Sequence, residues 1–416
     1  MSIASVLASL DFSVGMEKEK ELKKKTTSLV SLLTKELARK KIKGGVFVGG
    51  SFAKGTLMRQ ETYDVDIFVR FLPMKKSMSL VLEQVVLGIS KQIGKQMIRI
   101  HGSRDYFSIV DGEVHFEIIP VLKIRKSGEM ENVTDLSYFH VKYVTKKINR
   151  AIQREIVLAK AFCAAAGVYG AESYIQGFSG YALECLLIHY KRFKTFLEKM
   201  SKIEEQVIID PMKQYSSINE VKLQMNEARL KGPLVVVDPT NRERNVTAAL
   251  SWESFFKFQQ VARAFLKKPA VSYFTPTKRI LKAGRGTQHL RIHLSTDRQA
   301  GDIAGTKLSK FFRYLAREIE KHYQLIDKDF EYGGGADALG ELLVKAKEEV
   351  LRKGPPVSMV EAVASFKKKH RTTIVKEGVL YARMEPPGDG KEWLRRWIAH
   401  TKSVIGAMGI TDVRVL

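Results

Sequence analysis

The chain has 416 residues and a formal net charge of +25, because it contains 70 Lys and Arg residues but only 45 Asp and Glu residues. This length suffices for roughly two to four domains, and a positive field of this size attracts polyanions, of which nucleic acid is the usual one. The chain has no apolar run of about eighteen residues, no lipidation signal and no signal-peptide pattern, so we do not expect a membrane protein. Cys163 and Cys185 lie in apolar helical segments and are expected to stay reduced in the cytoplasm.

The first 125 residues are predicted to contain a small mixed sheet with helices on one side. Residues 1–43 have a helical pattern that ends in a basic cluster. A strand over residues 45–48 leads into a glycine turn and a helix start, and a second strand follows over residues 63–69. Further short β-rich runs and one helix over residues 78–94 complete this part.

The remainder alternates helical blocks with short strands. Helical blocks are predicted over residues 140–166, 180–208, 252–266, 306–323, 336–352 and 391–408. Strands are predicted over residues 234–238, 290–294 and 379–384, and Gly333, Gly334 and Gly335 mark a turn.

Two carboxylates lie on one face of the second predicted strand. Asp64 and Asp66 are two residues apart, and alternate side chains of a strand point to the same side. Like charges held side by side call for a cation between them, and Mg²⁺ prefers oxygen ligands of this kind. Asp-x-Asp alone is also common on solvated strands, so the neighbouring residues decide whether it indicates a metal site.

That context is a glycine-serine turn and a third acid. Gly50 and Ser51 offer backbone N–H groups and a hydroxyl where a helix begins, which suits a triphosphate. Glu117 interrupts an apolar strand just before Pro120, and a buried acid in such a run either pairs with a base or binds a metal. Asp64, Asp66 and Glu117 together meet the needs of two-metal phosphoryl chemistry.

These residues and several later segments carry a family resemblance. The chain resembles the archaeal-type (class I) CCA-adding tRNA nucleotidyltransferases of the DNA polymerase β-like superfamily, from its Gly-Ser turn and Asp-x-Asp onward. Residues 168–172 and 177–184 are similar to the family's neck region, and residues 238–246 to its nucleotide-pocket segment. The resemblance implies an α+β multidomain fold. It places a catalytic head over residues 1–145, a helical neck over 146–268, and an α/β body with a tail over 269–416.

The resemblance also implies a reaction and a set of site residues. A tRNA 3′-hydroxyl attacks the α-phosphate of CTP or ATP, so that C, C and A are added without a template. Mg²⁺ is the implied cofactor, held by Asp64, Asp66 and Glu117. The implied nucleotide-binding residues are Gly50, Ser51, Lys54, His140, Lys160, Tyr169 and Arg244. Arg244 is a planar donor fork suited to acceptors on C or A.

One candidate site residue departs from the pattern of the family. The third acid is usually Asp in the family but is Glu117 here, which keeps the charge and adds one methylene. The role of the neighbouring His115 stays unassigned.

A basic cluster formed by Lys367, Lys368, Lys369 and Arg371 suits the backbone of a tRNA acceptor stem. The sequence leaves open whether the chain forms a homodimer.

Two other functions are alternatives at this stage. A poly(A)- or oligoadenylate-type nucleotidyltransferase would share the carboxylates, and a non-catalytic RNA-binding protein would share the basic surface. A P-loop enzyme is disfavoured because residues 53–56 lack the spacing of that motif. A bacterial-type (class II) CCA-adding enzyme is disfavoured because its arginine-containing motifs are not found.

Overall fold

The computed structural model describes residues 2–276, 281–370, 372–384 and 388–416. The chain divides into two compact units, one of residues 1–171 with 175–276 and one of residues 172–174 with 277–416. This division does not separate the three predicted domains, whose boundaries stay predictions. Each unit is described by itself below.

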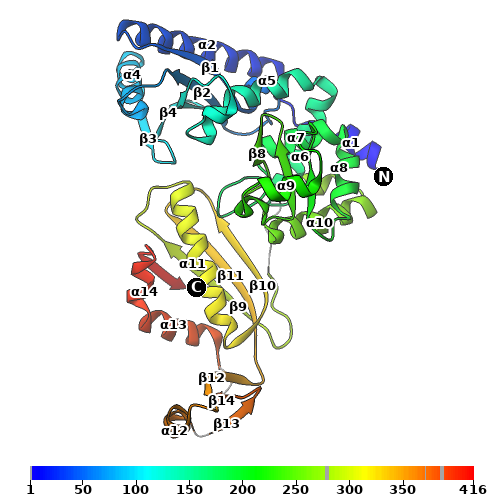
Figure 1. The fold of residues 1–416 in the computed structure, drawn as a ribbon, viewed down its shortest axis with the longest axis vertical. Coiled ribbons are helices and arrows are strands. Elements are labelled where there is room, and N and C mark those ends of the chain that lie inside the picture. Colours follow the sequence, from blue (N-terminus) through cyan, green and yellow to red (C-terminus); the bar gives the residue numbers. More distant parts are fainter. Residues whose placement is uncertain (1, 277–280, 371, 385–387) are drawn as a thin grey trace. The chain divides into compact units, whose positions relative to one another are not determined.

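The first unit begins with the predicted mixed sheet, whose strand order is β1-β2-β5-β4-β3. Strand β2 pairs with β1 antiparallel and with β5 parallel. The long helices α2 and α4 pack on one face of this sheet through an apolar cluster (Figure 1). The elements are α1 (Ile3–Ser9), α2 (Met16–Arg39), β1 (Gly44–Val48), α3 (Gly50–Lys54), β2 (Tyr63–Phe71), α4 (Met78–Ile93), β3 (Met97–Ile100), β4 (Tyr106–Asp111) and β5 (Val114–Leu122).

The packing of β2 decides which way its acids point. Val65, Ile67 and Val69 are fully buried in the cluster with α2 and α4. Because side chains alternate along a strand, Asp64 and Asp66 lie on the face turned away from these helices. The sheet therefore buries one face and presents carboxylates on the other.

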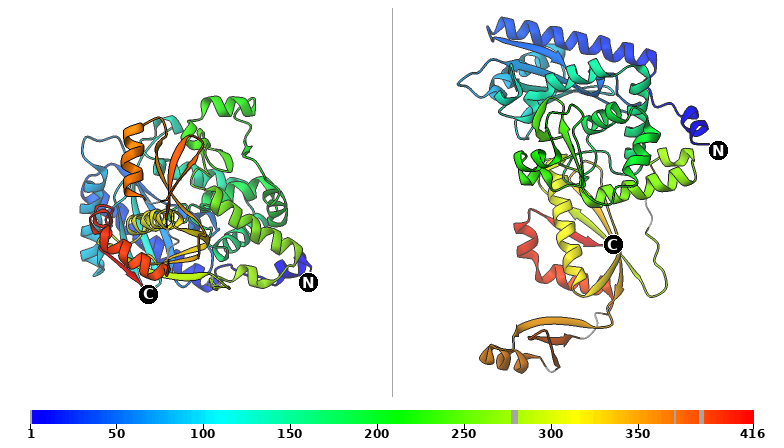
Figure 2. Two further views of the ribbon diagram at one scale, coloured as in Figure 1. Left: turned by 90° about the horizontal axis from the view of Figure 1, so that it is seen from below. Right: turned by 45° about the vertical axis from the view of Figure 1, so that its right-hand side comes forward.

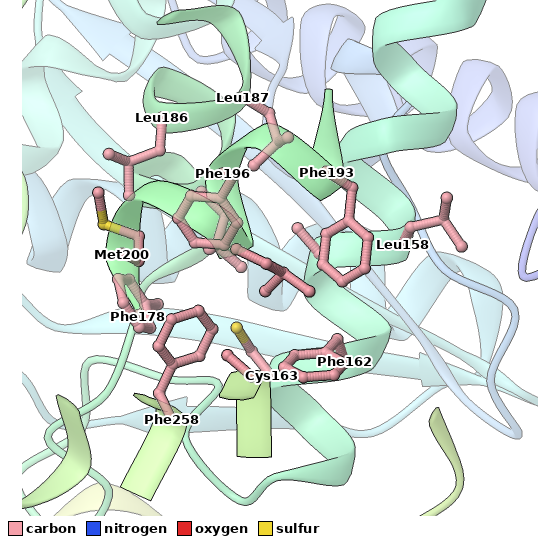
Figure 3. Packing of buried hydrophobic residues seen from close by; sticks show 14 of the residues in the cluster. Leu158, Phe162, Cys163, Phe178, Leu186, Leu187, Phe193, Phe196, Met200 and Phe258 are labelled. Atoms are coloured by element: carbon pink, nitrogen blue, oxygen red, sulfur yellow. The ribbon is translucent and has the colours of Figure 1, made fainter. Parts of the chain in front are cut away.

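The rest of the first unit is mainly helical, with a core rich in phenylalanine. Figure 3 shows Phe162, Phe178, Phe193, Phe196 and Phe258 packed together in this core. The predicted block over residues 140–166 is two helices, and the block over 180–208 ends in a short strand. The elements are α5 (Ser137–Lys147), α6 (Arg150–Ala165), α7 (Gly180–Tyr190), α8 (Phe193–Met200), β6 (Val207–Ile209), α9 (Ile218–Gln224), β7 (Leu234–Asp238), β8 (Asn241–Asn245) and α10 (Trp252–Lys267), with short 3-10 turns at Ser127–Glu129, Val133–Leu136, Glu227–Leu230 and Val271–Phe274.

The second unit is built on an antiparallel sheet of order β10-β11-β9-β15. Its chain order of β9, α11, β10, β11, α13 and β15 is that of a ferredoxin-like βαββαβ unit. Helices α11 and α13 pack on the same face through one apolar cluster (Figure 2). The elements are β9 (Gln288–Ser295), α11 (Asp302–Glu320), β10 (Tyr323–Tyr332), β11 (Asp337–Ala346), α13 (Gly390–His400), α14 (Lys402–Ala407) and β15 (Asp412–Val415).

The predicted helix over residues 336–352 is wrong. This segment forms β11 and the start of β12, and β11 pairs with both β9 and β10. Its apolar residues also alternate, since Ala338, Leu342 and Val344 are buried against α11, and sheet pairing selects that period. A smaller sheet of order β12-β14-β13 with helix α12 is inserted before α13. Its elements are β12 (Val350–Pro356), α12 (Val360–Lys369), β13 (Thr373–Lys376) and β14 (Val379–Met384).

Candidate active site

The glycine turn lies directly against the second aspartate. The backbone N–H of Gly49 donates to the carbonyl oxygen of Asp66 over 2.8 Å. Gly50 has φ of +59°, and a Cβ built on it would lie 1.6 Å from Asp66 Oδ2. Only glycine tolerates both the backbone angle and this approach. The turn that carries Ser51 is thereby held beside a carboxylate.

Parallel pairing of β2 with β5 brings the predicted acids onto adjacent strands. Asp66 lies in register with Glu117, and Asp64 with His115. Asp64 Oδ1 is 3.7 Å from His115 Nδ1, and the Asp64 side chain is 65 % exposed. Among the described residues, no three Asp, Glu, His or Cys side chains are grouped closely enough to form a ready metal site.

The two more buried acids of this face, Asp66 and Glu117, have raised pKa values. Burial raises the pKa of Asp66 to about 6, with Lys54 opposing and Asp64 adding to the shift. Burial also raises the pKa of Glu117 to about 7, and the charges of Asp66 and Asp64 add to it. Both carboxylates lack enough positive charge in their surroundings. A cation placed between them would relieve this deficit, so the donor set fits a divalent metal.

Behind the turn, two lysines share one buried glutamate. Lys54 Nζ lies 2.5 Å from Glu184 Oε2, and Thr56 Oγ1 donates to Glu184 Oε1 over 2.6 Å. Lys160 Nζ donates to Thr56 O, Thr56 Oγ1 and Glu184 Oε1 over 3.0, 3.0 and 3.1 Å. The predicted nucleotide ligand Lys160 is 1 % exposed, and these bonds occupy its three donors.

Tyr169 lies close to this lysine. A Cβ built on Gly180, at the start of α7, would lie 3.1 Å from the Tyr169 hydroxyl and 3.6 Å from Lys160 Nζ. The two predicted ligands thus approach the same helix start, and the missing side chain at Gly180 makes room for them.

The other two predicted ligands meet at one carboxylate. Arg244 Nη1 donates to Asp238 Oδ2 over 2.7 Å, and His140 Nε2 lies 3.0 Å from the same oxygen. Burial alone would raise the pKa of Asp238, but the hydrogen bond from His140 and the charge of Arg244 outweigh it and hold that pKa well below its usual range. Burial lowers the pKa of His140. Because a carboxylate oxygen accepts, the contact with Asp238 places a proton on Nε2, and the neutral form of this imidazole would present Nδ1 as an acceptor.

Tyr181 connects the two groups of ligands. Its ring stacks on His140 with 4.0 Å between centroids. Lys54 Nζ and the Arg244 guanidinium carbon each lie 5.8 Å from the centroid of the same ring. One tyrosine on α7 is thus flanked by the cation of the turn and by the two residues held by Asp238.

The sequence-based prediction did not include Glu184, Asp238 or Tyr181. Glu184 interrupts the apolar helix α7, which is the same signal that identified Glu117 on its strand. Asp238 ends strand β7, all of whose residues are buried. In the sequence, the available signal was an acid at the end of an apolar run. Glu184 binds Lys54, 130 residues away, whereas Asp238 binds Arg244, six residues away, as well as the distant His140.

Comparison with known proteins shows the family to which the chain belongs. A CCA-adding enzyme of Nanoarchaeum equitans is 33 % identical over 341 residues, which cover 81 % of this chain and 82 % of that protein. The chain belongs to the CCA-adding enzyme family. A CCA-adding enzyme of Saccharolobus islandicus is 32 % identical over 286 residues, covering 67 % of this chain and 65 % of that protein. The model for "tRNA nucleotidyltransferase, second domain" matches residues 154–275.

Two solved structures have a fold similar to that of this CCA-adding family member. A cytoplasmic RNA terminal U-transferase matches with a TM-score of 0.50 at 12 % identity, over 67 % of this chain and 98 % of that one. The Cid1 RNA terminal uridylyl transferase matches with a TM-score of 0.51 at 11 % identity, again over 67 % and 98 %. The predicted DNA polymerase β-like nucleotidyltransferase fold is confirmed.

Membership of the CCA-adding family confirms the predicted resemblance and makes the chain a nucleotidyltransferase. The alternative of a non-catalytic RNA-binding protein is set aside. No helix in the described part of the chain is both long and apolar enough to cross a membrane.

The predicted RNA-binding cluster lies in the second unit. Lys367, Lys368 and Lys369 form the last turn of α12, whose described residues include no buried side chain. Arg371 lies outside the described residues. The assignment of this cluster to RNA stays a prediction.

Proposed function

We propose that this chain completes the 3′ end of tRNA by adding C, C and A from CTP and ATP. The observation that carries the proposal is the pairing of β2 with β5, which sets Asp66 beside Glu117 and against the Gly49–Gly50 turn, in a chain of the CCA-adding family. The tRNA 3′-hydroxyl attacks the nucleotide α-phosphate, and pyrophosphate leaves. We expect this reaction in the cytoplasm, where Cys163 and Cys185 remain reduced.

Asp64, Asp66 and Glu117 would hold Mg²⁺. When bound, the metal would supply charge neutralisation and activation of the hydroxyl nucleophile. The raised pKa values of Asp66 and Glu117 support this assignment, because two neighbouring acids with such values are short of a cation. Glu117 provides the same carboxylate chemistry as the Asp that is usual in the family.

The nucleotide would be bound by the predicted ligands of the candidate active site. Gly50, Ser51 and Lys54 are assigned to the triphosphate, since the turn offers N–H groups, a hydroxyl and an ammonium beside Asp66. Arg244 is assigned to the base and His140 to a donor group of the nucleotide. Tyr169, whose hydroxyl lies next to the start of α7, would add a hydrogen bond to the triphosphate. Lys160 on α6 would act through Thr56 and Glu184 behind the turn, because its three donors are occupied there.

The tRNA would be held partly by the second unit. The exposed lysines at the end of α12, together with Arg371, are suited to phosphate contacts along an acceptor stem. A homodimer is compatible with this proposal but is not required by it.

The test is incorporation into a tRNA that lacks its CCA end, in the presence of Mg²⁺. CTP alone should give two additions, and ATP should then give one more. The variant carrying both Asp64→Ala and Asp66→Ala should be inactive, whereas Glu113→Gln, which changes an acid 62 % exposed on the adjoining turn, should retain activity. Long A or U tails would instead assign the chain to the polymerase alternatives. No incorporation by the wild type would overturn the proposal.

A further inference from the structure

The two oxygens of Asp238 have separate sets of partners. Oδ1 accepts from the Tyr181 hydroxyl over 3.0 Å and from the Thr240 backbone N–H and hydroxyl, each over 2.8 Å. Oδ2 has Arg244 Nη1 at 2.7 Å and His140 Nε2 at 3.0 Å. The first set joins Asp238 to the turn between β7 and β8 and to α7. The second set reaches residues assigned to the nucleotide.

We propose that Asp238, through Oδ2, is a positioning residue that sets nucleobase selectivity by holding the Arg244 guanidinium in one orientation. The inference rests on the proposed function and adds to it the residue that makes Arg244 selective. Asp238 is fully buried, whereas the Arg244 side chain is 25 % exposed. The carboxylate therefore does not need to touch the nucleotide, and it acts through the arginine.

The chemistry of the bases explains why orientation matters. Cytosine and adenine present a ring-nitrogen acceptor beside an amino group, whereas uracil and guanine present a ring N–H beside a carbonyl oxygen. A guanidinium donor aimed at the ring position meets an acceptor in the first pair and an opposing N–H in the second. An unrestrained guanidinium can turn toward the carbonyl oxygen and so accept either pair. Arg244 discriminates only if something prevents that movement.

The surroundings of Arg244 support a restraint of this kind. One guanidinium nitrogen is bonded to a buried carboxylate that bears full charge, which makes the contact a charge-assisted hydrogen bond. His140 is bonded to the same oxygen and stacks on Tyr181, so the acceptor itself is fixed. The carboxylate also balances the charge of the Arg244 guanidinium.

The decisive variant is Asp238→Asn. An amide oxygen in place of Oδ1 keeps the bonds from Thr240 and Tyr181, while an NH₂ group replaces Oδ2 and repels Arg244. The matched control is Thr240→Val, which removes one bond to Oδ1 and leaves Oδ2 unchanged. Arg244→Met removes the restrained group itself.

The readout is the ratio of kcat/KM for CTP to that for UTP, and for ATP to that for GTP, together with direct binding of the four nucleotides. Asp238→Asn is expected to lower each ratio about ten-fold or more, chiefly by gaining UTP and GTP. Thr240→Val should keep the wild-type ratios. The double variant Asp238→Asn, Arg244→Met should discriminate no worse than Arg244→Met, because both changes act on one restraint.

Two outcomes would overturn the inference. One is unchanged ratios in Asp238→Asn, and the other is an equal loss of kcat/KM for all four nucleotides with normal thermal unfolding. A wild-type protein that adds neither C nor A would instead count against the proposed function. Nucleotide binding would still test Asp238 in that case.

Discussion

Lys54 and Glu184, 130 residues apart in the sequence, form a buried ion pair with 2.5 Å between Nζ and Oε2. Glu184 also accepts from Thr56 and Lys160. A single carboxylate on α7 thus binds two lysines and a threonine hydroxyl behind the turn that carries Gly50 and Ser51. Glu184 is thus one of the side chains that tie the helical part of the first unit to the glycine turn, together with Lys160 and Gln153 on α6.

Removing that carboxylate is expected to destabilise the first unit. Glu184→Gln leaves two buried ammonium groups without a counter-ion, which should lower the free energy of unfolding by about 3–5 kcal/mol. Urea unfolding measures this loss. The control Glu198→Gln breaks an exposed pair with Lys194 and should cost less than about 1 kcal/mol. Equal small effects in the two variants would show that the buried pair contributes little.

The same glutamate predicts how stability depends on pH. Burial would raise the pKa of Glu184, but Lys54 and Lys160 outweigh it and lower that pKa from 4.5 to about 2. A folded-state pKa below the unfolded value stabilises the fold above pH 4.5, and this contribution is lost as the pH falls toward 2. The difference in unfolding free energy between wild type and Glu184→Gln should therefore shrink as the pH falls from about 6 to about 3. A constant difference over that range would contradict the assignment.

Glu117 is expected to be essential as a carboxylate but not as a glutamate. Glu117→Gln should slow C addition by about 10²–10³-fold, because an amide cannot replace a negatively charged ligand. Glu117→Asp, which introduces the residue usual in the family, should stay within about ten-fold of wild type. Single-turnover assays with saturating CTP measure both rates. A Gln variant as fast as Glu113→Gln would remove Glu117 from the proposed metal site.

Gly50 is expected to tolerate no side chain. In Gly50→Ala the added methyl group would meet Asp66 Oδ2 and the backbone would keep φ of +59°, so the turn must shift. We expect activity to fall by about 10²-fold, as is typical for a misplaced reacting group. Gly45→Ala, on β1 with nothing within 4 Å of the added atom, is the control for substitution of a glycine near the sheet. Similar activity in both variants would separate the turn from catalysis.

The sequence by itself determined the parts of the site that depend on local geometry. Asp64 and Asp66 share a face because strands alternate, and the glycine turn before them follows from the conformational freedom of Gly50. Glu117 was identifiable because a charged residue in an apolar strand requires a partner. The mixed sheet followed from the order of the short strands.

Only the tertiary structure decided which distant groups share a partner. Lys160 was predicted as a nucleotide ligand, yet it bonds Thr56, 104 residues away, and Glu184. His140 and Asp238 meet across 98 residues. Residues 336–352 were predicted to be a helix, but most of this segment forms β11, which pairs with β9 and β10. In each case the structure depends on a contact between segments that are separated in the chain, and a local sequence pattern does not reveal such a contact.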